Sequence, residues 1–253
     1  MKIEETIFLN NSWKWTSFLK YLINRLEIYD CSPYDIPSEY VYRESNFGKK
    51  KNKQVVSLYT WAARHHRINL ARAVCINSPN YEVLNFLIIP NTIYNVPFLG
   101  LDFVTLPKTH LLVLDFQPSL KIEKQFNKKL LEKIVRLRDN CHSQIPIAEK
   151  FSNDLSKFFS PGLIWSKLPR KESSEIIIST KLLSTFKSYL DLYLEILFKS
   201  NEVDLELEKE IINGQNDYLH FRKEKDPARP MLKNLFGDEF CESLIKNILF
   251  TTK

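Results

Sequence analysis

Five short apolar segments between residues 54 and 118 restrict the fold of this chain more than any other feature. Each is rich in β-branched and aromatic residues, which is typical of β-strands. They cover residues 54–62, 70–77, 83–89, 98–106 and 111–117. The polar or proline-containing spacers between them are too short for the crossover helices that parallel strands need. The sequence therefore predicts an antiparallel meander.

Helical patterns lie on both sides of this strand block. Before it, apolar residues recur every three or four positions from Trp15 to Leu26, with Asn11 or Ser12 as the expected N-cap. After it, helices are predicted over 123–140, 147–158, 177–199, 205–222 and 238–249, with an extended segment at 162–168. Residues 31–53 contain two prolines and a lysine run, which predicts a long surface connection. With no repeat and no linker, we expect one domain over 1–253, a sheet covered by helices.

The glycine and cysteine patterns exclude several classes of protein. The five glycines are scattered, whereas P-loop and GxGxxG sites need clustered glycines to bring backbone N–H groups to a phosphate. The four cysteines are isolated, with no CxxC pair and no histidine at the spacing of a zinc site. We therefore expect no bound metal and no resident cofactor. The isolated cysteines, with no signal peptide and no long apolar stretch, predict a soluble protein in a reducing compartment.

The charge balance leaves two interpretations open. The formal net charge is +6, from 36 basic and 30 acidic residues. Such an excess suits an acidic partner, which includes an acidic protein, a nucleic acid or an anionic small molecule. Ordinary solvation of the surface explains it equally well.

Three polar residues stand within strongly apolar strands. Asn85 lies at the centre of VLNFLII, where its buried amide needs hydrogen-bond partners. Backbone groups could supply them, and Asn85 would then have a structural role only. Asp102 lies between FLGL and FV, and Asp115 lies in LVLDFQ. Burial raises the pKa of a carboxyl group and suits it to donating a proton. An outward-facing strand position or a turn is the alternative for Asp102.

A second candidate site is the segment from Arg222 to Arg229, which reads RKEKDPAR. Because Pro227 disfavours helical geometry at Asp226, the preceding helix is expected to stop there. Asp226 is then either the N-cap of the next short helix or a functional carboxylate. Arg222 and Arg229 flank it, and a guanidinium is a common partner of carboxylates, those of a substrate included.

Four segments together resemble the ferredoxin-dependent bilin reductases, and the resemblance covers nearly the whole chain. They are NFLIIPNTIYNVPFLGLDFVTLPKTHLLVLDFQP from Asn85, FFSPGLIWSKLP from Phe158, YLDLYLE from Tyr189 and RKEKDPARPMLKNLFG from Arg222. The order FLGLDFV, LDFQP, EKDPAR is specific, although no single one of these motifs is. Pro230 departs from the DPARG of most relatives and stiffens this loop.

The resemblance implies a three-layer α/β/α sandwich with a central antiparallel sheet, and a linear tetrapyrrole bound between the sheet and the C-terminal helices. It implies that reduced [2Fe-2S] ferredoxin supplies single electrons and that no prosthetic group is bound. Asp102 and Asp226 match the aspartates to which the family assigns proton donation. Asn85 stands where the member that makes phycocyanobilin has a histidine, and that member's partner glutamate is also missing here.

These matches imply a two-electron reduction of the A-ring diene system of 15,16-dihydrobiliverdin to phycoerythrobilin. Asn85, Arg222 and Arg229 are the expected substrate-binding residues, the arginines as anchors for the propionates, although Arg222 is equally placed to hold Asp226. The alternatives are a reductase that acts on biliverdin, to 15,16-dihydrobiliverdin or by four electrons, and a carrier or lyase that binds the pigment without reducing it.

The partners follow from the same resemblance. Plant-type ferredoxins are acidic, and a basic face would speed their docking; Lys167, Arg170 and Lys171 are the candidates for that face. We expect a monomer that receives its substrate from the preceding bilin reductase, in the cytosol of a cyanobacterium or in the stroma of an algal plastid. No recognised nucleic-acid-binding module is present, so nucleic acid is not an expected partner.

Overall fold

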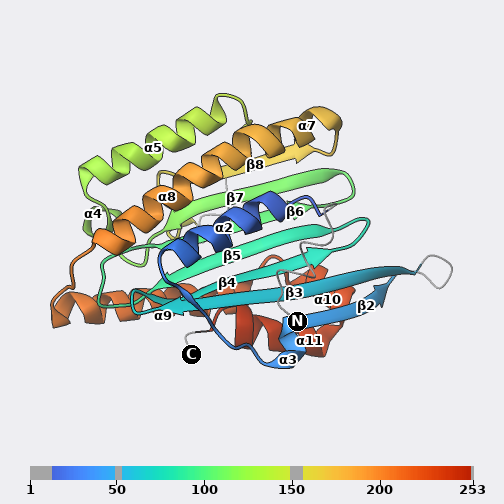
Figure 1. The fold of residues 1–253 in the computed structure, drawn as a ribbon, viewed down its shortest axis with the longest axis horizontal. Helices are drawn as coiled ribbons and strands as arrows, with labels where there is room; N and C mark the ends of the chain where they lie inside the picture. Colours follow the sequence, from blue (N-terminus) through green and yellow to red (C-terminus); the bar gives the residue numbers. More distant parts are fainter. Residues whose placement is uncertain (1–12, 49–52, 149–155, 252–253) are drawn as a thin grey trace.

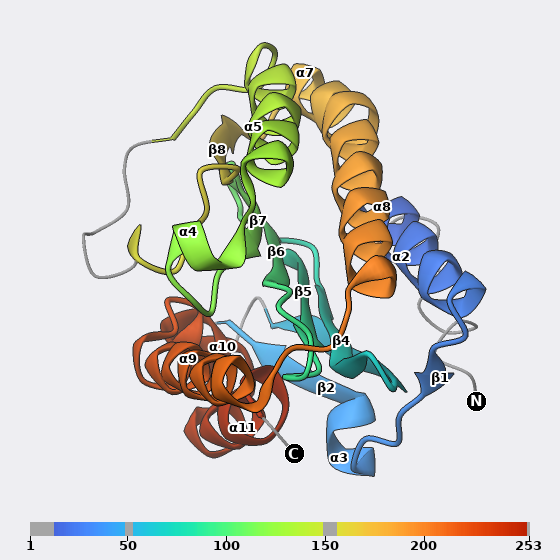
Figure 2. The same ribbon diagram turned by 90° about the vertical axis from the view of Figure 1, so that its left-hand side faces the viewer.

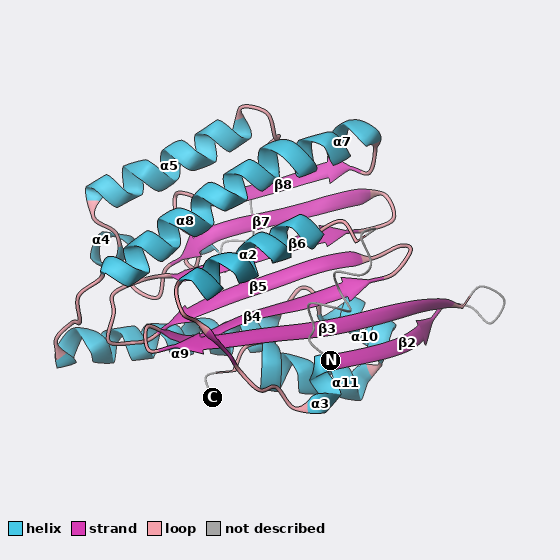
Figure 3. Cartoon of the chain, in the orientation of Figure 1, coloured by secondary structure: helices cyan, strands magenta, loops and turns pink. Residues whose placement is uncertain are grey.

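The structure is a computed structural model that describes residues 13–48, 53–148 and 156–251. At its centre is an antiparallel sheet of eight strands (Figure 3). The strands are β1 (Ser32–Pro33), β2 (Tyr42–Phe47), β3 (Gln54–His65), β4 (Ile68–Asn77), β5 (Glu82–Pro90), β6 (Phe98–Thr105), β7 (Thr109–Gln117) and β8 (Ile164–Pro169). Their order in the sheet is β1-β3-β4-β5-β6-β7-β8, and β2 pairs with β3.

The predicted meander is confirmed, because β3 to β7 lie side by side in chain order and the extended segment 162–168 adds β8. The surface connection predicted for residues 31–53 is wrong in part, since it holds β1, β2 and the short helix α3 (Ser38–Val41). The strand β2 reads YRESNF and is largely exposed at the edge of the sheet. It therefore lacks the apolar alternation that marks a half-buried strand.

The remaining helices are α2 (Thr16–Ile28), α4 (Ile122–Gln125), α5 (Lys128–His142), α7 (Glu172–Ile177), α8 (Leu183–Lys199), α9 (Leu205–Lys225), α10 (Arg229–Phe236) and α11 (Asp238–Leu244). The π-helical turn η1 (Ile178–Leu182) joins α7 to α8, and η2 (Ile245–Leu249) continues α11. The predictions for 177–199, 205–222 and 238–249 are therefore confirmed. None of the helices in the described ranges is both long enough and apolar enough to cross a membrane.

Three helix predictions need correction or lie outside the described residues. The helix predicted over 123–140 is two helices, because the chain turns extended at Phe126 and Asn127, and Asn127 caps the second helix by accepting a hydrogen bond from the Leu130 N–H at 2.9 Å. Most of 147–158 is not described, and residues 147–148 and 157–158 are not helical. The expected caps Asn11 and Ser12 also lie outside the described residues; α2 begins at Thr16.

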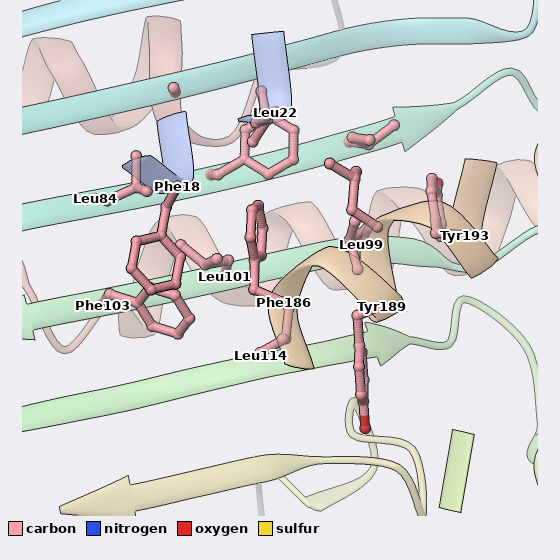
Figure 4. Packing of buried hydrophobic residues seen from close by; sticks show 14 of the residues in the cluster. Phe18, Leu22, Leu84, Leu99, Leu101, Phe103, Leu114, Phe186, Tyr189 and Tyr193 are labelled. Carbon is pink, nitrogen blue, oxygen red and sulfur yellow. The ribbon is translucent and has the colours of Figure 1, made fainter. Parts of the chain in front are cut away.

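Helices cover both faces of the sheet, so the three-layer sandwich is confirmed. Helices α2, α5 and α8 lie on one face, and α9, α10 and α11 lie on the other (Figures 1 and 2). On the first face, the rings of Phe18, Phe103 and Phe186 pack together, with Phe18 5.3 Å from Phe103 and 5.4 Å from Phe186 (Figure 4). This face is a closed aromatic core.

The alternation of side chains along β6 sends different residues to the two faces. Leu99, Leu101 and Phe103 belong to the core under α2 and α8. Gly100 and Asp102 therefore face the C-terminal helices. The polar residues of the central strands gather on this second face.

Candidate active site

A cavity of about 70 Å³ lies between the sheet and the C-terminal helices. Its walls come from β4 to β7, from α9, from the loops before β8 and after α9, and from the C-terminal segment after η2. The lining residues are Arg72, Asn85, Phe86, Leu87, Gly100, Leu101, Asp102, Val113, Gln117, Phe159, Tyr218, Arg222, Pro227 and Phe250. Three of the predicted site residues, Asn85, Asp102 and Arg222, are thus brought together.

Asp102 is a half-buried carboxyl group directly opposite Asn85 in the pairing of β5 with β6. Burial raises the pKa of Asp102 to about 6, and the nearby Asp226 carboxylate acts in the same direction. The charge of Arg222 and the hydrogen bond with Asn85 oppose this rise. This is the direction that the apolar sequence around Asp102 predicts, and with a pKa of about 6 a fraction of Asp102 carries a proton at neutral pH.

Asp226 follows the last residue of α9, as Pro227 predicts, and its side chain is buried. Its Oδ1 accepts a hydrogen bond from the Ala228 N–H at 3.1 Å and lies 3.7 Å from Nη2 of Arg222. Asp226 is therefore not the N-cap of α10, which starts after Ala228. Its neighbours Arg222 and Pro227 line the cavity, whereas Asp226 stands just behind them.

Arg229 is directed away from this cavity. Its guanidinium pairs with Glu242 and donates to the backbone carbonyl of Lys223. The candidate docking residues Lys167, Arg170 and Lys171 are exposed, at and just after the end of the edge strand β8.

Sequence reasoning missed three polar residues of the cavity, of which Arg72 is the most unusual. Arg72 is 2% exposed, and its guanidinium donates to Asn85 Oδ1 and twice to the carbonyl of Leu249, at 3.0 and 2.7 Å. The signal was a single arginine in the apolar strand INLARAVCIN. Such a residue must find partners for a buried charge.

Tyr218 and Gln117 form the other missed pair. The hydroxyl of Tyr218 on α9 donates to Oε1 of Gln117 on β7. A side chain at Gly100 would collide with Gln117, so the glycine makes room for this contact across the sheet. Gln117 lies in the LDFQP motif, but its type alone does not reveal that it meets a tyrosine 101 positions away.

Asp115 is fully buried on the same face and does not line the cavity. Its carboxyl group accepts hydrogen bonds from the backbone N–H of Ser160 at 2.8 Å and from the Ser160 hydroxyl. Burial raises the pKa of Asp115 to about 7. Asp115 thus holds the loop before β8, whose Phe159 forms one wall of the cavity.

Among the described residues, no three His, Cys, Asp or Glu side chains are grouped so that they could hold a metal ion. The four cysteines are free and buried. Burial raises the pKa of the Cys31 and Cys241 thiols to about 11. The charged residues that line the cavity are Arg72, Asp102 and Arg222.

Comparison with known proteins establishes the class to which this fold and site belong. The family model described as ferredoxin-dependent bilin reductase matches residues 19–251. The chain belongs to this family, as its motifs predict, and is an oxidoreductase that uses ferredoxin.

The relatives of known name are more specific. The chain is 63% identical, over 253 residues and all of both sequences, to the phycoerythrobilin:ferredoxin oxidoreductase of Prochlorococcus marinus strain MIT 9301. It is 39% identical to the protein of that name from strain MIT 9211, over 95% of this chain and 94% of the relative. The crystal structure of tomato phytochromobilin synthase with biliverdin shares the fold, with a TM-score of 0.79 and 23% identity over 94% of this chain and 83% of that one.

Proposed function

We propose that this protein reduces the A-ring diene system of 15,16-dihydrobiliverdin to phycoerythrobilin with electrons from ferredoxin. The observation that carries the proposal is the placement of two carboxyl groups: Asp102 lines the cavity from the sheet, and Asp226 lies behind Arg222, which lines the cavity from the helical side. The name shared by the relatives supports the choice of product.

The reaction balances with two electrons and two protons. Two reduced ferredoxins each deliver one electron, the conjugated diene gains one hydrogen at each end, and one double bond remains between them. Each added electron makes the bilin more basic, so that a nearby carboxylic acid is able to protonate it. Asp102, whose pKa of about 6 keeps a protonated fraction at neutral pH, donates one proton, and Asp226 donates the other. Solvent then restores both.

Arg222 is the favoured anchor for the negatively charged propionates of the substrate. It is buried at the cavity wall, and its Nε has no hydrogen-bond partner in the described part of the chain. Arg229 would have to leave Glu242 to take this role. Asn85 presents its amide to the same cavity. Unlike the histidine at this position in the family member that makes phycocyanobilin, the amide does not titrate.

A tetrapyrrole needs more room than 70 Å³, since binding sites for small molecules usually measure about 300–1,000 Å³. A second cavity of about 220 Å³ lies on the same face and shares Arg72 with the first. Residues of the C-terminal segment border both, Phe250 the first and Ile248 the second. In this proposal the bilin joins the two cavities and displaces this segment.

An anaerobic assay with reduced ferredoxin tests the proposal. Biliverdin and 15,16-dihydrobiliverdin are offered separately, and the products are separated by chromatography. We expect only the dihydro compound to react and phycoerythrobilin to form. Turnover of biliverdin would replace the assignment with another reaction of the family, and binding of both pigments without turnover would indicate a carrier.

The setting of the reaction follows from the same proposal. We propose a monomer that acts in the cyanobacterial cytosol and takes 15,16-dihydrobiliverdin from the reductase that makes it. Ferredoxin docks on the basic residues at the end of β8.

A further inference from the structure

Arg72 is a buried cation without an acidic partner. Its side chain is fully enclosed between β4 and the C-terminal segment, and it forms no ion pair with any carboxylate of the described residues. Its contacts are a carbonyl, an amide oxygen and the ring of Phe250, 5.8 Å from the guanidinium carbon. Burying a charge without an acidic partner costs free energy, so we expect Arg72 to have a function other than packing.

The strand order β4-β5-β6 sets Arg72, Asn85 and Asp102 on one face of the sheet, with Asn85 directly opposite Asp102 and Arg72 diagonal to Asn85, because Arg72 pairs with Leu87. An asparagine side chain has one acceptor atom and one donor group. Because Arg72 can only donate, it takes Asn85 Oδ1, and the amide nitrogen of Asn85 is left for Asp102. Asn85 lies directly opposite Asp102, so its amide nitrogen is placed to donate to that carboxyl group, and such donation favours the ionised carboxylate.

We propose that Arg72 is a positioning residue that orients the Asn85 amide and thereby sets how firmly Asp102 holds its proton. The inference rests on the proposed function only where it links this proton to catalysis. Without Arg72, the Asn85 amide would be free to turn its oxygen toward Asp102. That oxygen would accept from, and so stabilise, the protonated acid.

The groups that face Asp102 come from four elements. Arg222 on α9 and Arg72 on β4 lower its pKa by their charge, Asn85 on β5 lowers it by its hydrogen bond, and Asp226 after α9 raises it. Burial outweighs the three lowering effects, so the pKa of Asp102 is about 6. Loss of Arg72 removes one of the charges and also releases Asn85, and both changes act upward.

A matched control exists in the same hairpin. Like Arg72, Arg67 makes two donations to backbone carbonyls at the end of a helix, here those of Leu197 at 3.0 Å and Ser200 at 2.7 Å, and it also lies over an aromatic ring, that of Tyr94. It does not line the cavity. Arg67→Met therefore reproduces the lost helix contacts and the lost charge of Arg72→Met, but not the link to Asn85.

The experiment titrates the Asp102 carboxyl carbon by ¹³C NMR in the whole, ligand-free protein, with the signal assigned by its loss in Asp102→Asn. We expect Arg72→Met to move the midpoint upward by about one pH unit. The kcat/KM profile should move in the same direction, while Arg67→Met leaves both in place. Because the titration needs no bilin and no ferredoxin, it stands even if the proposed reaction is wrong.

A second variant keeps the test decisive if Arg72→Met does not fold. Asn85→Leu preserves the size of the side chain and cuts the link while Arg72 stays charged. We expect a smaller upward movement of the Asp102 midpoint, because the charge of Arg72 still acts. An unchanged midpoint in whichever variant folds, or an equal movement in Arg67→Met, would overturn the inference.

Discussion

The two faces of the central sheet are built from the same strands but differ in what they bury. Along β6, Leu99, Leu101 and Phe103 enter an aromatic core, while Gly100 and Asp102 face a cavity. The first face is closed by α2 and α8. The second is covered by α9 to α11 and buries charged groups in its otherwise apolar layer.

Successive side chains of a strand point to opposite faces of the sheet. One strand can therefore place residues that stabilise the fold on one face and residues that serve the chemistry on the other. Apolar burial on one face stabilises the sheet, whereas a buried carboxylate or guanidinium on the other destabilises it unless it is paired. Substitutions on the first face should therefore change the free energy of unfolding, and those on the second should change turnover or its pH dependence.

The largest effect is expected for the two carboxylates of the cavity face. Asp102→Asn should lower kcat by about 10²–10⁴-fold, because positioned general acids contribute this much. Its melting temperature should stay the same or rise, since a buried carboxyl group is replaced by a neutral amide. Asp226→Asn should bind the bilin and stall before product. Single-turnover absorbance spectra with reduced ferredoxin measure the turnover of both variants.

Asp191→Asn is the control for these variants. Asp191 lies on α8 and pairs with Arg25 and Tyr21 at 2.7 and 2.6 Å, on the other face of the sheet. It should keep full turnover. Wild-type rates in Asp102→Asn and Asp226→Asn would show that both aspartates are structural and that the protons come from elsewhere.

On the aromatic face, Phe186→Ala should show the opposite pattern. Phe186 is fully buried against Phe18 and Phe103, and such a truncation costs about 3–5 kcal/mol. Urea denaturation measures the loss. At a temperature where the variant is still folded, its kcat should stay near that of the wild type. A large fall in kcat for the folded variant would mean that the two faces are coupled.

The sequence predicts this division unevenly. The strand segments and the apolar partners of β6 follow from periodicity, and Asn85, Asp102 and Asp115 are visible as polar residues in apolar strands. The sequence does not show that Arg222 reaches the cavity and Arg229 does not, because both lie close to Asp226, four residues before it and three after it. Their roles depend on how α9 and α10 pack on the sheet.

The missed residues teach the same lesson. Arg72 meets the carbonyl of Leu249, 177 positions later, and Tyr218 meets Gln117 across 101 positions. No local pattern encodes contacts at such separations. The edge strand β2 was missed for a different reason, since an exposed strand needs no apolar side chains.

A smaller effect is expected for Asp115, the buried carboxyl group of the second face. Its pKa is raised from 3.8 to about 7, so the folded protein holds this proton more tightly than the unfolded chain. Its contribution to stability is therefore full below about pH 4 and is lost as the pH rises to about 7. Asp115→Asn should reduce the difference in unfolding free energy between about pH 5 and about pH 8 by about 1–3 kcal/mol.

Urea midpoints at the two pH values measure this difference. Ser160→Ala serves as the comparison, because it removes one donor to Asp115 and keeps the carboxyl group. It should retain a pH dependence that Asp115→Asn loses. An unaltered pH dependence in Asp115→Asn would assign the effect to another group, such as Asp102.

The smallest effect concerns the edge where electrons are expected to enter. Lys167 is paired with Leu111 across the strands and so points to the cavity face, as Val113 does. Changing Lys167, Arg170 and Lys171 to Gln should raise the KM for ferredoxin a few-fold at low salt, because exposed charges steer an acidic partner. The effect should shrink as salt is added, since the screening length falls to about 10 Å at 0.1 M.

The control triple variant carries the same loss of charge on the opposite layer. Lys128, Lys129 and Lys133 are exposed on α5, and their change to Gln should leave the KM for ferredoxin close to that of the wild type. An equal rise in both triple variants would mean that ferredoxin senses only the net charge of the protein. A rise confined to the β8 variant would place electron entry on the face that holds the carboxylates, which would make the division between the two faces complete.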